Sequence, residues 1–446
     1  MPPFLRWKER LFANHFIRSL SVVMAGTALS NVLIIVTTPV LTRLYTPEEF
    51  GSLSVFLSIL YTLTIITSLR YETAIPIPKK DDDAFHLFIL SAGLVVVVSA
   101  LACITILLLQ FADVFQIPGV QGHMWILSLS LFGIGMFQVL NCWALRTEEY
   151  SAVSKSKVMM NGGQVLSQVL LGFIHPGVLS LLVGEVAGRI TGTFAYLKTV
   201  NMERLRSHKF NARKMKEVMV RYKSFPLLSS WSALINSLGS QAPVFFLVAI
   251  FDTKTAGFFF LAQKVLTVPE GLLGFSASQV YLSQAAQKAR QSYEQFHAFF
   301  WGIVFKMTVM GVIAIGAVTL VAPLLIEIVF GEAWKETGVY IQALAILYIT
   351  KIIINPITAN FYVFEALKTQ IAGEIIRFFL ILLSIIIAIQ SKEDPVMAIL
   401  WISIGSSIGY CCIGFLSWYV MKRHTFMSPI MSNPEVLSGR GDEGGV

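Results

Sequence analysis

Charged side chains are scarce in this sequence of 446 residues, since Asp, Glu, Lys and Arg together make up only 13% of it. Apolar residues make up 55%, with 33 Phe among them, and the mean hydropathy is +0.70. Soluble domains carry about 25% charged residues, so the composition excludes a soluble chain. We therefore predict an all-α polytopic membrane protein.

Cysteine is also rare, and all four cysteines lie inside apolar segments: Cys103, Cys142, Cys411 and Cys412. They provide neither a disulfide framework nor the spacing of a metal site. No Walker loop, HExxH motif or glycosyltransferase-like acidic cluster is present. We therefore predict a protein that is not an enzyme and that holds no metal and no cofactor.

Twelve apolar segments of roughly 20 residues are long enough to cross a bilayer. They lie near residues 18–42, 50–70, 84–109, 123–145, 158–174, 177–197, 226–251, 256–283, 298–326, 338–364, 370–389 and 396–420. These spans predict an interfacial N-terminal segment, a first lobe of six helices, a basic loop, a second lobe of six helices and a disordered tail. The corresponding residues are 1–16, 17–200, 201–224, 225–421 and 422–446.

Basic residues are distributed unevenly between the two sides of the predicted membrane. The N-terminal side, the even-numbered loops and the tail carry 25 Lys and Arg, and the odd-numbered loops carry four. Because basic loops stay in the cytoplasm, both termini are predicted to be cytoplasmic. Residues 201–223 alone carry eight Lys and Arg. Nucleic acid is a poor partner for them, because membrane spans flank this stretch and no aromatic residues for base stacking interrupt the basic ones.

The two halves of the chain share two features. The first is a proline late in spans 1 and 7, followed by a glycine that opens the next span: Pro39 with Gly51, and Pro243 with Gly257. The second is a pair of glycines four residues apart in spans 6 and 12: Gly184 with Gly188, and Gly405 with Gly409. Glycine and proline are common in membrane helices, so chance similarity is the alternative. We predict a repeat, with two pseudo-twofold-related six-helix lobes around a central cavity.

Five basic residues lie at membrane depth, where each costs roughly 2.5–3.5 kcal/mol unless it meets a partner or water. Two of them have an acid one helical turn away: Arg189 with Glu185, and Arg377 with Glu374. These are either purely structural pairs or part of a binding site. The other three, Lys264, Lys306 and Lys351, have no acid within a helical turn of their own span.

Polar residues form stripes on three of the spans. Span 10 places Tyr348, Lys351, Asn355, Thr358 and Tyr362 on one face, and span 8 does the same with Lys264, Thr267, Gly271, Gly274 and Ser278. In span 2 the stripe consists of Ser54, Ser58, Tyr61 and Ser68, with Arg70 and Glu72 at its cytoplasmic end. The stripes indicate a hydrated cavity lined by cations. The alternative is that a lysine such as Lys306 reaches along its span to the interface.

Carboxylates are absent from the interior of spans 1 to 5 and of span 7. A carrier of organic cations needs a carboxylate where its cargo sits, whereas lysine and arginine suit phosphate or diphosphate. The expected cargo is therefore anionic.

Two segments carry a resemblance to known families. Residues 39–51, PVLTRLYTPEEFG, and 69–75, LRYETAI, resemble the N-terminal signature of bacterial polysaccharide flippases. These are the O-antigen (Wzx-type) family of the multidrug/oligosaccharidyl-lipid/polysaccharide (MOP) exporter superfamily. Residues 263–274 also resemble lipid II flippases, which have arginine where Lys264 stands and fourteen spans rather than twelve. The likeness covers about residues 17–425.

The resemblance implies a MOP/MATE-like fold and a flippase for undecaprenyl-diphosphate-linked oligosaccharide in the bacterial inner membrane, working by alternating access. It implies membrane lipid, a polysaccharide polymerase and a chain-length regulator as partners, and no nucleic acid. The candidate substrate-binding residues are Lys264, Lys351, Arg70, Lys306, Arg43 and Arg377. Glu270 and Glu374 are the candidates for coupling to an H⁺ or Na⁺ gradient.

Two other functions stay open. A MATE-like drug or metabolite exporter shares the fold, but the missing carboxylates in spans 1 and 7 disfavour it. A polymerase or glycosyltransferase generally presents a large periplasmic loop, whereas the longest outward loop here has only about a dozen residues.

Overall fold

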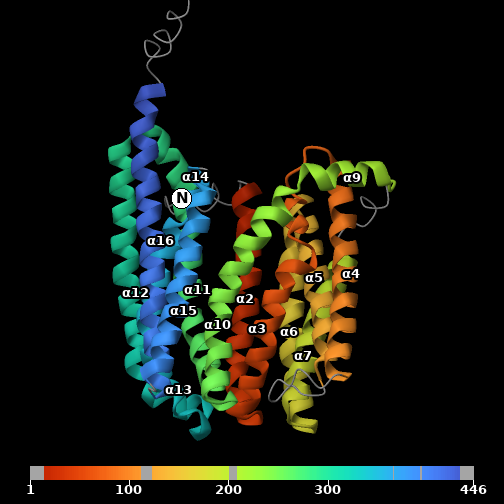
Figure 1. The fold of residues 1–446 in the computed structure, drawn as a ribbon, viewed down its shortest axis with the longest axis vertical. Helices are drawn as coiled ribbons and strands as arrows, with labels where there is room; N and C mark the ends of the chain where they lie inside the picture. Colours follow the sequence, from red (N-terminus) through yellow and green to blue (C-terminus); the bar gives the residue numbers. More distant parts are fainter. Residues whose placement is uncertain (1–14, 112–122, 200–207, 365, 392–393, 432–446) are drawn as a thin grey trace, which may run out of the picture. The chain divides into compact units, whose positions relative to one another are not determined.

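The computed structural model describes residues 15–111, 123–199, 208–364, 366–391 and 394–431, and within these ranges it is helical without strands (Figure 1). Twelve long helices make up the described chain. They are α2 (His15–Leu44), α3 (Pro47–Thr67), α4 (Asp81–Phe111), α5 (Trp125–Arg146), α6 (Tyr150–Ile174), α7 (Val178–Thr199), α10 (Ser230–Ile250), α11 (Thr253–Gln291), α12 (Tyr293–Phe330), α13 (Thr337–Ile357), α15 (Leu367–Ser391) and α16 (Pro395–Met431).

Each long helix overlaps one of the twelve predicted spans. Eleven of the described segments are long and apolar enough to cross a membrane, and α6 falls outside that set. Its apolar part is diluted by polar residues such as Lys157, Gln164 and Gln168. The short elements are η1 (Tyr71–Ala74), α9 (Ala212–Arg221), η2 (Phe225–Ser229), η3 (Glu332–Trp334) and α14 (Asn360–Val363). The chain is thus a multi-pass, all-α membrane protein.

Three helices, α11, α12 and α16, are much longer than a bilayer is thick. The 39 residues of α11 and the 38 residues of α12 span nearly 60 Å each at about 1.5 Å per residue, against a hydrocarbon core of about 30 Å. We expected disorder from residue 422, but the 37-residue α16 continues to Met431. Residues 1–14 and 432–446 lie outside the described ranges.

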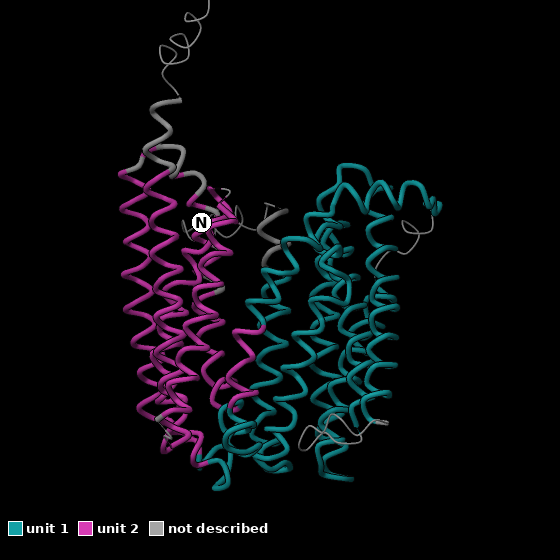
Figure 2. The backbone as a smooth tube through the Cα atoms, in the orientation of Figure 1, with its two compact units in different colours: residues 1–237, 247–260, 327–334 teal, residues 238–246, 261–326, 335–446 magenta. Residues whose placement is uncertain are grey.

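The described chain divides into two compact units (Figure 2). Unit 1 consists of residues 1–237, 247–260 and 327–334, and unit 2 consists of residues 238–246, 261–326 and 335–446. The boundary therefore differs from the expected division at residues 201–224. The end of α10, the start of α11 and the end of α12 belong to unit 1. Most of α11 and α12 belongs to unit 2.

The start of α3 is defined by a capping box. The Thr46 N–H donates to Glu49 Oε2 at 2.8 Å, and the Glu49 N–H donates to Thr46 Oγ1 at 3.4 Å. Pro47 occupies the first turn, where its missing N–H is not needed. The chain therefore reverses from α2 into α3 within two residues, and this reversal fixes the position of Gly51.

The two glycines of the predicted repeat, Gly51 and Gly257, contact each other's helices within unit 1. A Cβ on Gly51 would lie 1.7 Å from the Thr253 carbonyl oxygen, and one on Gly257 would lie 1.9 Å from the Pro47 carbonyl oxygen. The starts of α3 and α11 therefore meet backbone to backbone. This contact explains why both positions are glycine.

Replacing Gly51 with alanine is expected to destabilise unit 1 by at least about 1–3 kcal/mol, because the added methyl overlaps backbone that cannot move aside. Gly162→Ala in α6 is the matched control, because a Cβ there meets nothing within 4 Å. The midpoint of thermal unfolding in detergent measures both changes. Equal midpoints for the two variants would contradict the close approach seen at Gly51.

The paired glycines of spans 6 and 12 also have matching roles. In unit 1, Gly184 and Gly188 of α7 lie against α6, where a Cβ on Gly188 would be 2.7 Å from the Met160 carbonyl oxygen. In unit 2, Gly405 and Gly409 of α16 lie against α15, where a Cβ on Gly405 would be 3.0 Å from the Leu380 carbonyl oxygen. In both halves the last long helix thus packs closely on the helix before it, as the predicted repeat requires.

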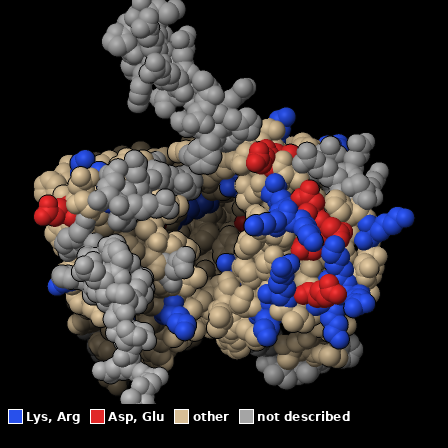
Figure 3. Space-filling view, turned by 90° about the horizontal axis from the view of Figure 1, so that it is seen from above, with Lys and Arg blue, Asp and Glu red and all other residues tan. Residues whose placement is uncertain are grey.

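The described part of the basic stretch forms α9 and binds the acidic start of α4. Arg221 pairs with Asp83 at 3.2 Å, and Lys214 pairs with Asp82. Figure 3 shows basic and acidic side chains gathered over this region. His86 Nε2 also accepts a hydrogen bond from the Asn211 N–H at 3.1 Å. The helix is therefore held against unit 1, and Arg204 and Arg206 lie outside the described residues.

Candidate substrate-binding site

The polar stripes of α11 and α13 face each other within unit 2. The Tyr348 hydroxyl donates to the Gln263 carbonyl oxygen and lies 3.4 Å from Thr267 Oγ1. Two turns further along, Asn355 Nδ2 donates to Glu270 Oε1 at 3.2 Å. The 3.6-residue period of both helices brings these groups to one side. Glu270 thereby joins the stripe that the sequence placed beside it.

Lys351 occupies the middle of this polar face. Its Nζ lies 4.5 Å from the centroid of the Tyr348 ring, in cation–π geometry, and Glu270 and Tyr410 act on it electrostatically. Among the described residues no acid pairs with it within 4 Å. The ammonium is half-buried, whereas Tyr348 is only 2% exposed. Lys351 is thus a cation at membrane depth with no direct carboxylate partner.

Arg377 of α15 is buried and fully paired. Its Nε and Nη2 lie 3.0 and 2.9 Å from Glu374 Oε2, and Nη1 donates to the Tyr410 hydroxyl at 3.0 Å. Gly409 of α16 lets the helices approach, because a Cβ there would lie 2.5 Å from Arg377 Cγ. The Arg377–Glu374 ion pair that the sequence indicated is present. Arg377 therefore already has protein partners in the absence of a ligand, as a structural residue does.

Tyr410 was missed by the sequence analysis. Its hydroxyl accepts a hydrogen bond from Arg377, and the Arg377 guanidinium carbon lies 4.9 Å from its ring centroid. Tyr410 also interacts electrostatically with Lys351. The only signal in the sequence was its position directly after Gly409 of the glycine pair. Tyr410 therefore connects the polar face of α13 with the ion pair of α15.

Lys264 does not behave as the unpaired ammonium that we expected. It is half-buried on α11, one turn before Thr267, and it takes part in an interaction within the structure. The expectation counted only acids of its own helix, and a partner from elsewhere in the fold is invisible to such a count. Lys351 therefore remains the lysine at depth on the polar face that has no acid within 4 Å among the described residues.

Unit 1 contains its own buried charge pair. The side chains of Glu185 and Arg189, both on α7, are 4% and 7% exposed and form an ion pair. Gln164 of α6 donates a hydrogen bond to the Glu185 carboxylate, and Tyr61 of α3 interacts with Arg189. The two charges of this cluster therefore neutralise each other, and only Arg189 Nε is buried without a hydrogen-bond partner among its described members.

A family model described as "Polysaccharide biosynthesis protein" matches residues 40–339, which is more than half of the chain. The chain belongs to this polysaccharide biosynthesis family. The match includes α3 with Arg70, the whole of α11 with Lys264 and Glu270, and the start of α13. No curated protein sequence matches the chain.

Solved structures similar to this polysaccharide biosynthesis protein are transporters of the MOP superfamily. A multidrug resistance MATE family transporter in an inward-facing conformation has a TM-score of 0.70 at 13% identity, covering 93% of this chain and 99% of that one. The lipid II flippase MurJ, in an inward closed conformation, has a TM-score of 0.67 at 14% identity, covering 94% and 93%. A MOP superfamily transporter from Pyrococcus furiosus has a TM-score of 0.62 at 12% identity, covering 92% and 96%. These similarities show that the chain has the MOP/MATE-like fold.

Lys306 lies on a different kind of surface from Lys351. It is exposed on α12, and its neighbours Phe305 and Val309 are 70% and 42% exposed. Lys306 is also 24 residues before the end of α12 at Phe330, about 36 Å along the helix axis. That distance exceeds the hydrocarbon thickness of about 30 Å. The placement favours the alternative in which Lys306 reaches the interface.

Arg43 is located at the end of α2, at the opposite membrane face from Arg70. Its Nη2 donates to the carbonyl oxygens of Ile328 and Val329, at 3.3 and 3.5 Å, at the end of α12. Trp334 Nε1 donates to the Thr42 carbonyl oxygen beside it at 2.9 Å. Arg43 therefore caps a helix end within unit 1.

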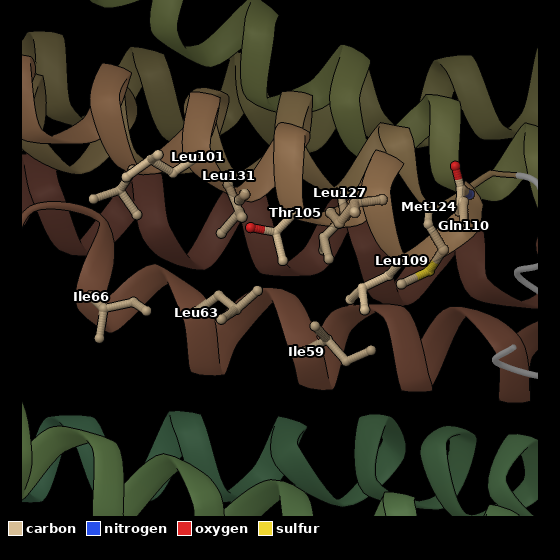
Figure 4. Close-up of a pocket in the computed structure, with 13 residues that line it drawn as sticks. Ile59, Leu63, Ile66, Leu101, Thr105, Leu109, Gln110, Met124, Leu127 and Leu131 are labelled. Atoms are coloured by element: carbon tan, nitrogen blue, oxygen red, sulfur yellow. The ribbon is translucent and has the colours of Figure 1, made fainter. Parts of the chain in front are cut away.

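An apolar groove of about 370 Å³ is present in unit 1 between α3, α4 and α5 (Figure 4). Aliphatic side chains and one Met line it apart from two polar residues, Thr105 and Gln110. Leu101 lines the groove and is also 57% exposed, so the groove opens to the side of the bundle. Such a lining accepts a hydrocarbon chain and offers no charge to an anionic headgroup.

Proposed function

We propose that this protein is a flippase that moves an undecaprenyl-diphosphate-linked oligosaccharide, a repeat unit of O-antigen or of another surface polysaccharide, across the bacterial inner membrane by alternating access. The observation that carries the proposal is the half-buried Lys351 ammonium, which has no acid within 4 Å among the described residues, in a member of a polysaccharide biosynthesis family. A cation held at membrane depth calls for an anion. A diphosphate is the anion that a lipid-linked sugar carries.

Lys351 supplies a point charge to a diphosphate oxygen, and the Tyr348 ring holds its ammonium in place. Asn355, Thr267 and the tyrosine hydroxyls offer neutral hydrogen bonds, which tolerate sugars of different structure. Lys264 is a second cation on the neighbouring helix face. The lipid chain stays in the bilayer, as its hydrophobicity requires.

Coupling to an H⁺ or Na⁺ gradient involves Glu270 and Glu374 in this proposal. Glu270 interacts electrostatically with Lys351 and accepts a hydrogen bond from Asn355. Glu374 accepts a hydrogen bond from Arg377. Binding of a cation to Glu270 removes a competitor for Lys351 and so favours the anionic cargo. A Glu270→Gln variant that transports normally would remove this residue from the coupling step.

The orientation with both termini in the cytoplasm is supported by the excess of basic residues in the N-terminal segment, the even-numbered loops and the tail. In that orientation Arg70 is on the side where the lipid-linked sugar is made. A polymerase and a chain-length regulator are then the partners expected on the opposite side.

A MATE-like exporter of drugs or metabolites is the second candidate, favoured by the similarity to a multidrug resistance transporter. The described parts of α2 and α10 contain no carboxylate for a cationic drug. A dye-efflux assay in a pump-deficient strain discriminates the two, because a flippase confers no efflux.

Deleting the gene tests the proposal directly. We expect loss of the surface polysaccharide and accumulation of lipid-linked repeat units that face the cytoplasm. Normal polysaccharide in the deletion strain would refute the proposed function.

A further inference from the structure

The loop after α3 holds two residues in a rarely used backbone conformation. Leu69 and Arg70 have φ values of +51° and +63°, in the left-handed region, and neither is glycine. Two consecutive non-glycine residues of this kind persist only where the surrounding structure imposes them, and such sites concentrate where ligands bind or switches operate.

Several contacts hold the segment that follows these two residues. Arg146 of α5 donates to the Pro78 carbonyl oxygen at 2.7 Å and pairs with Asp81 at 2.6 Å. The Tyr71 hydroxyl donates to the Met219 carbonyl oxygen of α9 at 3.1 Å. Thr73 Oγ1 donates to the Arg70 carbonyl oxygen at 2.7 Å. The loop is therefore a rigid support that presents the Arg70 side chain.

The Arg70 guanidinium has unused hydrogen-bonding capacity. Its Nε is buried and has no hydrogen-bond partner among the described residues. Glu72, two residues on, is 4% exposed and accepts a hydrogen bond from the Ser68 hydroxyl. Arg70 and Glu72 interact through their charges without forming an ion pair within 4 Å in the described structure. The site thus contains a cation with an unused donor and, two residues on, a buried carboxylate whose charged form that cation favours.

Few other titratable groups face Glu72. Cys142 of α5 interacts with both Glu72 and Arg70. At the start of α4, Asp81, Asp82 and Asp83 are paired with Arg146, Lys214 and Arg221. The neighbouring η2 carries no titratable side chain. Burial raises the pKa of Glu72, and the Ser68 hydrogen bond, a backbone hydrogen bond and the Arg70 charge oppose that rise. Glu72 therefore takes up a proton more readily than an exposed glutamate does, and loss of the Arg70 charge favours the protonated form further.

We propose that Glu72 is a proton-binding site controlled by Arg70, so that an anionic diphosphate engaging Arg70 makes Glu72 take up a proton. The anion neutralises the charge that keeps Glu72 ionised, and the carboxylate then accepts a proton from the aqueous phase. The new carboxyl O–H donates to Ser68 Oγ, which changes from donor to acceptor. When the anion leaves, the proton returns to water. This inference rests on the proposed function for the identity of the anion.

Proton uptake on binding is the first test. Calorimetric titration of the purified, detergent-solubilised protein with farnesyl diphosphate, repeated in two buffers of different ionisation enthalpy, counts the protons taken up. We expect Glu72→Gln, which keeps the bond to Ser68, to bind within about threefold of the wild type but with uptake lowered by up to one proton. Glu148→Gln, at an exposed acid near the same helix ends, is the control and should leave uptake unchanged. Equal uptake in the wild type and in Glu72→Gln would overturn the proposal.

A second measurement needs no diphosphate. Infrared difference spectra recorded across a pH titration should show the C=O band of a buried protonated carboxyl in the wild type and not in Glu72→Gln. In Arg70→Gln the band should persist to higher pH, because the counter-charge is gone. Absence of the band, or no shift in Arg70→Gln, contradicts control of Glu72 by Arg70. If the band behaves as expected but the wild type binds no farnesyl diphosphate, the result contradicts the proposed diphosphate cargo. The link between diphosphate binding and proton uptake is then refuted, whereas the titration of Glu72 under the control of Arg70 is kept.

Discussion

Replacing Lys351 with alanine is expected to lower the surface polysaccharide at least tenfold and to trap lipid-linked repeat units on the cytoplasmic side. A hydrogen bond to a charged group contributes about 1.5–3 kcal/mol, and each 1.4 kcal/mol is about a factor of ten in binding. No acid pairs with Lys351 within 4 Å among the described residues, so removing the lysine leaves no carboxylate there without an ion-pair partner. The loss should therefore appear in transport rather than in protein abundance.

The matched control for this experiment is Lys306→Ala. It removes the same group from a membrane helix at an exposed position beside Phe305, and it is expected to leave the polysaccharide unchanged. Lys351→Arg should retain partial function, since it keeps the charge but changes the geometry. Immunoblots of membranes verify equal amounts of each variant. Wild-type polysaccharide with Lys351→Ala would remove Lys351 from the binding site, and the cation-lined site in unit 2 with it.

Helical periodicity was sufficient to predict the polar face of this site. Tyr348, Lys351 and Asn355 recur at three- and four-residue steps, so the sequence alone places them on one side of α13. The sequence also showed polar stripes on the spans that became α11 and α3, and it did not indicate which of them contacts α13. The structure places Thr267 and Glu270 there.

Contacts between distant parts of the chain were not predictable in the same way. Tyr410 reaches Arg377 only because Gly409 allows α16 to approach α15. A single sequence shows the glycine pair but not which residue will fill the space opposite. The same limit applies to Gly51 and Gly257, since the repeat indicated that they correspond and only the structure shows that they touch.

The loop after α3 shows a further limit. Arg70 and Glu72 were visible as charges at the end of a polar stripe, but the left-handed backbone at Leu69 and Arg70 was not, because neither residue type favours it. The segment that follows is held by contacts with distant residues, such as those of Arg146 and Tyr71, which a single sequence does not reveal. Local sequence preference therefore failed to predict the backbone conformation beside the proposed proton-binding site at Glu72.

Replacing Arg189 with methionine is expected to destabilise unit 1 by about 3–5 kcal/mol, because the Glu185 carboxylate would be left buried without its cation. Gln164 would still donate to Glu185, but one neutral hydrogen bond does not replace a guanidinium. The double variant Glu185→Gln/Arg189→Met removes both charges and keeps an acceptor for Gln164. It should recover most of the lost stability, since the desolvation cost of the carboxylate disappears with it.

The control for this pair is Lys198→Met, which removes a cation from an exposed position on the same helix. Thermal unfolding of the purified proteins in detergent should rank Arg189→Met well below the double variant, with Lys198→Met close to the wild type. If the double variant is as unstable as Arg189→Met, the pair contributes through packing against α6 rather than through charge. In that case α7 depends on the close approach at Gly188, and the network with Gln164 is secondary.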